Sequence, residues 1–131
     1  MLNRSRNTPS RRRGGLELDL SSYSSVKYFC ARVAKLDGGD AVILKAGLAT
    51  RIFEIFEGDE NCVTVNVISK IFLALLLIHT LHASTAKWNT VPTLMITCSD
   101  IYSRAKFLER YAPDSLQVLC DQKYNYDAPG V

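Results

Sequence analysis

Apolar residues recur at helical spacing along much of the chain, and the first such segment follows a cluster of serines. The positions three or four residues apart are Val26, Phe29, Cys30, Val33 and Leu36. This spacing places them on one face of a helix. Four serines between residues 21 and 25 supply possible N-caps, and Gly38-Gly39 supplies a C-terminal stop. We predict the first helix between these two signals.

A second broad apolar face extends over residues 41–57. Asp40 is a suitable N-cap before this segment, and Gly58 follows it as a stop. Gly47 lies inside the segment, where glycine costs a helix about 1 kcal/mol relative to alanine or permits a neighbouring element to pack closely. We predict a second helix over residues 41–57.

The longest apolar run is IFLALLLI, residues 71–78. A membrane-spanning helix needs about 20 apolar residues, whereas Lys70, His79 and His82 flank this run. We therefore predict the central helix of a soluble core and no stable membrane span. Valines alternate with polar residues just before the run, a pattern that alone indicates a strand, but no breaker separates the two. The predicted helix covers about residues 65–82.

The next start signal is Asn89-Thr90, with Pro92 in the first turn, where a missing N–H is tolerated. Apolar residues then fall at helical spacing up to Ala112, and Pro113 stops the helix. A last short helix follows. These segments predict an all-α fold, a compact bundle of about five helices behind a disordered basic N-terminal arm.

A mixed α/β fold is the alternative for residues 93–121. In that interpretation residues 94–98 and 116–120 are parallel strands on either side of a helix over residues 101–111, because short apolar runs do not distinguish strand from helix. Cys98, Ser99 and Asp100 would then follow the carboxyl end of a strand, where α/β proteins bind ligands. This is the best enzyme hypothesis that the sequence offers.

Length and composition indicate one globular domain. The chain has 131 residues, of which 47% are apolar, enough for a hydrophobic core without disulfides or metals. We predict a disordered arginine-rich arm over residues 1–15, a single domain over residues 16–125 and a loose tail over residues 126–131.

Charge is distributed unevenly between the arm and the rest of the chain. The arm holds five basic residues and no acid, whereas the other 116 residues hold 11 basic and 13 acidic residues, a net charge of −2. The arm's basic residues are Arg4, Arg6, Arg11, Arg12 and Arg13. Guanidinium groups on a flexible tether attract polyanions and pair with phosphate without reading bases. Arg104, Lys106 and Arg110, beside Tyr102 and Tyr111, form a second candidate nucleic-acid surface.

The sequence carries no catalytic, metal-binding or cofactor-binding signature. Its four cysteines are far apart, without the short ligand spacing of a zinc site. Free buried thiols are therefore expected, which indicates a reducing, intracellular compartment. The glycines form neither a phosphate-cradling loop nor a dinucleotide fingerprint, and no serine lies in a nucleophile-elbow pattern. We predict no enzyme, no metal and no cofactor.

These observations favour a non-enzymatic, sequence-independent nucleic-acid-binding protein. Its layout is that of a small capsid or nucleocapsid protein, with RNA as the first candidate partner of the arm, possible self-association, and the nucleus or a virion as candidate locations. The alternative is a helical protein–protein interaction module whose arm is a nuclear-import or organelle-targeting signal.

Overall fold

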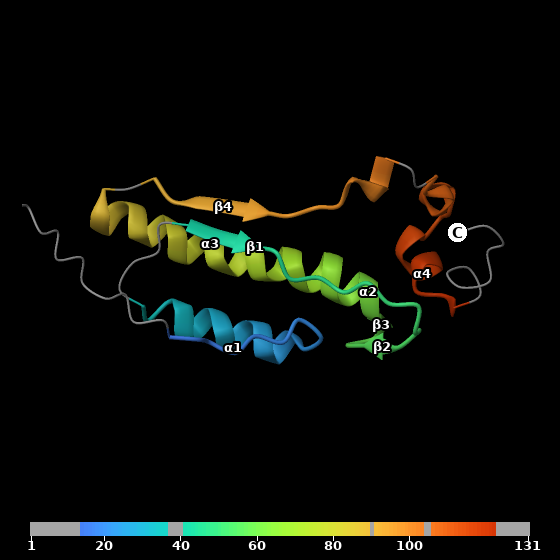
Figure 1. Ribbon diagram of the computed structural model, residues 1–131, viewed down its shortest axis with the longest axis horizontal. Helices are drawn as coiled ribbons and strands as arrows, with labels where there is room; N and C mark the ends of the chain where they lie inside the picture. The colour runs from blue at the N-terminus through green and yellow to red at the C-terminus, as the bar shows by residue number, and fades with distance from the viewer. Residues whose placement is uncertain (1–13, 37–40, 90, 104–105, 123–131) are drawn as a thin grey trace, which may run out of the picture.

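The computed structural model describes residues 14–36, 41–89, 91–103 and 106–122 (Figure 1). Its elements, in chain order, are α1 (Tyr23–Val33), β1 (Ala41–Leu44), β2 (Ile55–Phe56), β3 (Asp59–Glu60), α2 (Asn61–Val63), a π-helical turn (Thr64–Ile68), α3 (Ser69–Trp88), β4 (Thr93–Ile96), 3-10 turns (Asp100–Ser103 and Leu108–Tyr111) and α4 (Ser115–Leu119). The protein is therefore mixed α/β, and the predicted all-α bundle is wrong.

The strands β1 and β4 pair in parallel, and their arrows run in the same direction beside the long helix (Figure 1). Leu44 faces Ile96 at the carboxyl end of the pair. The predicted helix over residues 41–57 is instead β1, a loop and β2. Val42 and Ile43 are β-branched and suit a strand, but a run of four residues is too short to show the two-residue period of a strand.

The α/β alternative has the right class but the wrong second strand. β4 overlaps the strand predicted over residues 94–98, whereas residues 115–119 form α4. The Asp114 carboxylate caps α4 by accepting a hydrogen bond from the Gln117 N–H at 2.9 Å. The partner of β4 is therefore β1, which precedes it in the chain.

The π-helical turn joins α2 to α3, so that one continuous helical segment runs from Asn61 to Trp88 (Figure 1). The predicted central helix is present and extends beyond residues 65–82 at both ends. Asn89 ends it in the left-handed conformation, with φ at 50°, and donates its N–H to the Thr85 carbonyl at 3.0 Å. Leu73 and Leu77 are among its most buried side chains.

By length and composition alone, the segment Asn61–Thr85 would suffice to cross a membrane, a test that core helices of soluble proteins also pass. Here Leu73, Leu77 and Leu81 are buried within the described part of the chain. Packing in a core therefore explains part of the apolar character of this helix. The absence of a membrane span stays a prediction.

The hydrophobic core lies where α1, α3 and one face of the strand pair meet. Val26 and Cys30 of α1 pack into one cluster with Leu44 of β1 and with Leu73 and Leu77 of α3. Full burial of an aliphatic side chain contributes about 1.5–3 kcal/mol. This cluster holds the helices against the strands and thereby fixes where β1 and β4 end.

A short hairpin, β2–β3, closes the other end of the core. Glu57 and Gly58 form its turn with positive φ angles of 56° and 102°. Glu57 also accepts a hydrogen bond from the Tyr23 N–H at 2.8 Å, which caps the first turn of α1. The Thr64 hydroxyl donates to the Phe56 carbonyl at 2.9 Å. The hairpin therefore ties α1 to the start of the long helix.

Candidate functional site at the carboxyl ends of the parallel strands

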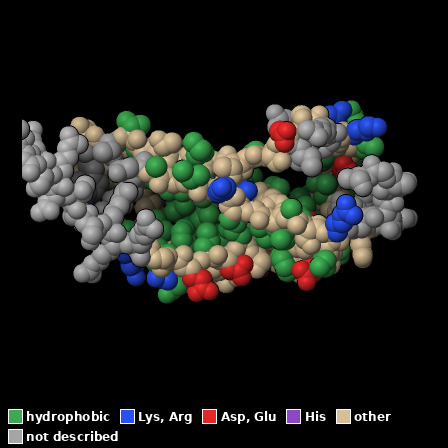
Figure 2. Space-filling model, viewed as in Figure 1, with side chains coloured by type: hydrophobic (Ala, Val, Ile, Leu, Met, Phe, Trp, Pro, Cys, Tyr) green, Lys and Arg blue, Asp and Glu red, His purple; other side chains and the backbone are tan. Residues whose placement is uncertain are grey.

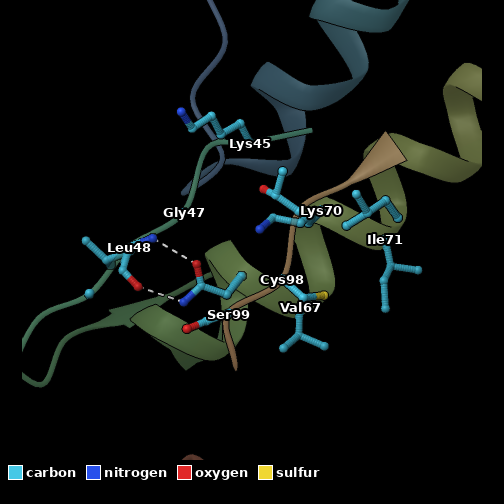
Figure 3. A pocket seen from close by; sticks show the side chains of 12 residues that line it. Lys45, Gly47, Leu48, Val67, Lys70, Ile71, Cys98 and Ser99 are labelled. Atoms are coloured by element: carbon cyan, nitrogen blue, oxygen red, sulfur yellow. Dashed lines mark hydrogen bonds between the residues drawn. The ribbon is translucent and has the colours of Figure 1, made fainter. Parts of the chain in front are cut away.

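A hollow of about 880 Å³ lies where β1 and β4 end (Figure 3). We call it the carboxyl-edge hollow. Three segments line it: Lys45, Gly47, Leu48 and Ala49 after β1; Asn66, Val67, Lys70 and Ile71 on the long helix; and Ile96, Thr97, Cys98 and Ser99 at the end of β4. Ligands of α/β proteins bind outside the carboxyl ends of parallel strands, and ligand pockets have about this volume.

Asn66 fastens the loop after β1 to the long helix. Its Oδ1 accepts the Leu48 N–H at 2.8 Å, and its Nδ2 donates to the Leu48 carbonyl at 2.7 Å (Figure 3, dashed lines). Both backbone groups of Leu48 are thus satisfied by one side-chain amide, as in a strand pairing. This double hydrogen bond also sets which amide atom is oxygen.

The π-helical turn and Gly47 make this contact possible. Asn66 lies within the turn, a type of helix distortion that occurs frequently at functional sites. A Cβ at position 47 would lie 2.9 Å from Asn66 Oδ1 and 3.7 Å from Lys70 Nζ. A side chain there would displace Asn66, so close packing is the role of Gly47, one of the two readings that its sequence position allows.

The residues after β4 supply hydroxyl and thiol groups to the same hollow. Thr97 bonds back to β1, because its N–H and its hydroxyl both donate to the Leu44 carbonyl, at 3.1 and 3.0 Å. Cys98 and Ser99 follow and are exposed at the hollow. The sequence-based hypothesis that residues 98–100 follow a strand's carboxyl end is therefore confirmed for this segment.

The walls of the hollow are largely apolar, and its charged groups are lysines. Leu48, Ala49, Ile71 and Ile96 supply apolar surface. Hydrophobic side chains also gather along the middle of the face drawn in Figure 2. Lys70 contributes a buried stem, whereas Lys45 is exposed. No aspartate or glutamate is among the lining residues that the structure describes.

The basic residues predicted to bind nucleic acid are not brought to this hollow. Arg4, Arg6, Arg11, Arg12, Arg13 and Arg104 lie outside the described residues. Lys106 and Arg110 are exposed in the segment before α4, and the Arg110 guanidinium lies 4.6 Å from the centre of the Tyr111 ring. Their contact with nucleic acid stays a prediction.

The four cysteines are free thiols, as expected, but only Cys30 is fully buried. Burial raises the pKa of the Cys30 thiol because an apolar environment disfavours the thiolate. Cys62 and Cys120 are half-buried, and Cys98 is exposed. The expectation that all four act as buried hydrophobes is therefore wrong for Cys98, which lines the hollow.

Comparison with known proteins gives one consistent result. The chain is 38% identical over 99 residues to a short chain dehydrogenase/reductase of Cryptosporiopsis sp., covering 75% of this chain and 31% of that protein. It is 35% identical over 105 residues to a short chain dehydrogenase of Gibberella zeae, covering 80% and 31% respectively. A short-chain dehydrogenase of Penicillium roqueforti is 34% identical over 107 residues, covering 82% and 28%.

The chain thus spans about a third of the length of these curated relatives. It matches no family model and no solved structure. The relatives point to an oxidoreductase, which contradicts the predicted non-enzymatic nucleic-acid-binding protein of nucleocapsid-like layout. The prediction that the chain is no enzyme is contradicted with it. The alternative of an interaction module agrees better with the relatives in that it requires no nucleic acid.

Sequence reasoning missed the site because its parts are far apart in the chain. Asn66 stands in an apolar stretch, and nothing local shows that its amide pairs with Leu48. Gly47 is a weak but usable signal, since an isolated glycine in an apolar segment marks a close approach of backbone. The strongest signal was Cys98-Ser99 after an apolar run, and it depended on reading that run as a strand.

Proposed function

We propose that this chain forms part of the active site of an oxidoreductase that transfers a hydride between a nicotinamide cofactor and a hydroxyl or carbonyl carbon. The carboxyl-edge hollow carries this proposal, because it lies at the ends of two parallel strands joined through a long helix. A relative that matches 83% of this chain necessarily matches residues 45–99, which include all three lining segments. Geometry and similarity therefore refer to the same region.

The lining residues fit the reacting end of such a cofactor. When bound, the nicotinamide ring would supply the carbon that accepts or gives the hydride. Leu48, Ala49 and Ile96 offer an apolar wall for a flat ring, and Thr97 and Ser99 offer hydroxyls beside it. The 131 residues contain no glycine-rich dinucleotide fingerprint, so they hold no loop of that kind for the pyrophosphate.

The remaining roles follow from positions in the hollow. Ser99 carries a hydroxyl that is able to donate to a substrate oxygen, which would orient a carbonyl and favour negative charge developing on it. Asn66 is a positioning residue, because its amide holds the Leu48 backbone and with it the apolar wall. The apolar lining of the hollow would exclude water from the reacting atoms.

The test is binding of NADH and NADPH to the full chain, followed by amide chemical shifts. The chemical shifts of the Leu48, Thr97 and Ser99 amides should change until the ligand saturates, whereas those of the Gln117 and Val118 amides in α4 should not change. A generic oligonucleotide serves as the comparison ligand and should leave the three hollow amides unchanged. If neither dinucleotide moves them, the proposed function is wrong.

A further inference from the structure

Lys70 is an unusual group to find in the wall of the carboxyl-edge hollow. It lies in the first turn of α3 and is only 9% exposed, yet it is one of the lining residues. Its side chain points across the hollow toward Gly47 (Figure 3). A Cβ on Gly47 would lie 3.7 Å from the Lys70 Nζ, so the bare glycine leaves room in front of the ammonium.

The ammonium of Lys70 has no hydrogen bond or ion pair with another residue that the structure describes. No described acid lines the hollow, and the nearby Asn66 Oδ1 already accepts the Leu48 N–H. Lysine commonly buries its stem and keeps its charge toward solvent. The Lys70 stem is buried, but its ammonium opens into the hollow and has no described partner, so an oxyanion there would gain charge-assisted hydrogen bonds without displacing another group.

Lys45 is a solvent-exposed lysine at the same hollow and serves as the comparison for Lys70. It also lines the hollow, but it is exposed, and its side chain points away from Lys70 (Figure 3). Its charge is solvated and needs no partner. The two lysines therefore form a matched pair of the same charge at the same hollow, one with a buried stem and one that is exposed.

We infer that Lys70 binds an oxyanion, a phosphate or a carboxylate, of the ligand that occupies the carboxyl-edge hollow. This inference rests on the proposed function, since it assigns an acidic group to a ligand of that same hollow. The ammonium supplies up to three N–H donors, and Gly47 leaves space for the oxyanion beside them. The acidic group belongs either to the nicotinamide nucleotide or to the substrate, and the two sources are separable by experiment.

The experiment compares wild-type full chain with Lys70→Met and Lys45→Met. Methionine keeps an apolar stem of similar length and removes the charge. The probes are inorganic phosphate, acetate, nicotinamide mononucleotide and NADPH, with affinities taken from amide shifts at Gly47 and Leu48. Lys70→Met should weaken binding of at least one oxyanion probe about tenfold or more, and Lys45→Met should change it less than about twofold.

The pattern across probes identifies the source of the anion. A parallel loss for phosphate, the mononucleotide and NADPH assigns the oxyanion to the cofactor. A loss for acetate with NADPH unchanged assigns it to the substrate. Equal affinities in wild type and Lys70→Met, or wild type that binds neither phosphate nor acetate, would overturn the inference.

Two controls keep the result decisive. Far-UV circular dichroism checks the fold, and Lys70→Gln replaces Lys70→Met if the latter unfolds. In wild-type protein the Lys70 ε-methylene carbon shift should also move with phosphate or acetate and stay fixed with chloride. If NADH and NADPH fail to bind, the proposed function fails, while the phosphate and acetate titrations still decide the role of Lys70.

Discussion

The two faces of the β1–β4 pair have opposite environments. On the inner face, Leu44 is buried against α1 and α3. On the outer face, the paired residues Ile43 and Met95 are 62% and 52% exposed. Parallel strands in proteins are normally covered on both faces. We call the inner face, with the helices packed on it, the closed side, and the outer face the open side. The closed side has a complete core, whereas the open side presents apolar surface of a kind that is buried in larger α/β proteins.

The long helix likewise has one buried side and one exposed apolar side. Leu73, Leu77 and Leu81 face the core, while the exposed apolar residues Val67, Ile71, Leu75 and Ile78 lie on another side. The hollow is located between the two regions, since Val67 and Ile71 also line it. Residues on the closed side should therefore contribute most to the stability of the fold. Residues at its border with the open side, where the hollow lies, should contact the ligand.

The largest effect is expected in the closed core of α3. Leu77 is 2% exposed and Leu75, two positions earlier, is 58% exposed. Leu77→Ala should lower the free energy of unfolding by about 2–5 kcal/mol because it leaves a cavity. Leu75→Ala should change it by less than about 0.5 kcal/mol. Urea unfolding measures both, and equal losses would show that the two sides do not differ.

The next largest loss of stability is expected at the border between the closed and open sides, where Gly47 and Asn66 are in contact. Gly47→Ala should break the Asn66–Leu48 hydrogen bonds because its Cβ would lie 2.9 Å from Asn66 Oδ1. We expect a loss of about 1–3 kcal/mol from either Gly47→Ala or Asn66→Ala.

The double variant should lose little more than one single variant, since both remove the same contact. Gly15→Ala is the control, because a Cβ at Gly15 meets nothing within 4 Å. Fully additive losses in urea unfolding would separate Gly47 from Asn66 and contradict this description of the site.

A smaller effect is expected on the open face. Ile43→Lys should change the free energy of unfolding by less than about 0.5 kcal/mol, measured by urea unfolding. Val42→Lys, one residue away and half-buried on the inner face, should destabilise the protein clearly. If Ile43→Lys is as damaging as Val42→Lys, the outer face is covered in solution.

The smallest effect is one of thiol reactivity. Cys98 is exposed at the hollow, whereas Cys30 lies in the closed core, where burial raises the pKa of its thiol. A thiol whose pKa is raised forms its reactive thiolate only at higher pH. Cys98 should therefore react with a disulfide reagent at least about tenfold faster than Cys30 near neutral pH. A Cys98→Ser variant that keeps the fastest phase would contradict the assignment.

Local signals were sufficient for the helices of the closed side. The apolar spacing from Val26 onward and the run over residues 71–78 both predicted helices that the structure contains. An amphipathic helix reveals itself within a dozen residues because its apolar face has its own period. Its core face could thus be located without knowledge of what packs against it.

The strands and the site could not be derived in the same way. β1 and β4 are four residues each, and each is stabilised by a partner strand from which the long helix separates it along the chain. Asn66 and Lys70 gain their roles only when that helix lies beside Gly47. Conversely, the five arginines of the arm formed the most visible feature of the sequence and drew the functional prediction away from the α/β body.

The position of the nicotinamide ring on the full chain would show directly whether the carboxyl-edge hollow binds the cofactor. Nuclear Overhauser contacts between the ring protons of bound NADH or NADPH and protein methyl groups would provide it. We expect contacts to the methyls of Leu48 and Ile96, the apolar wall at the carboxyl ends of β1 and β4. Contacts only to methyls near α4, such as those of Leu116, or no contacts at saturating dinucleotide, would contradict this expectation.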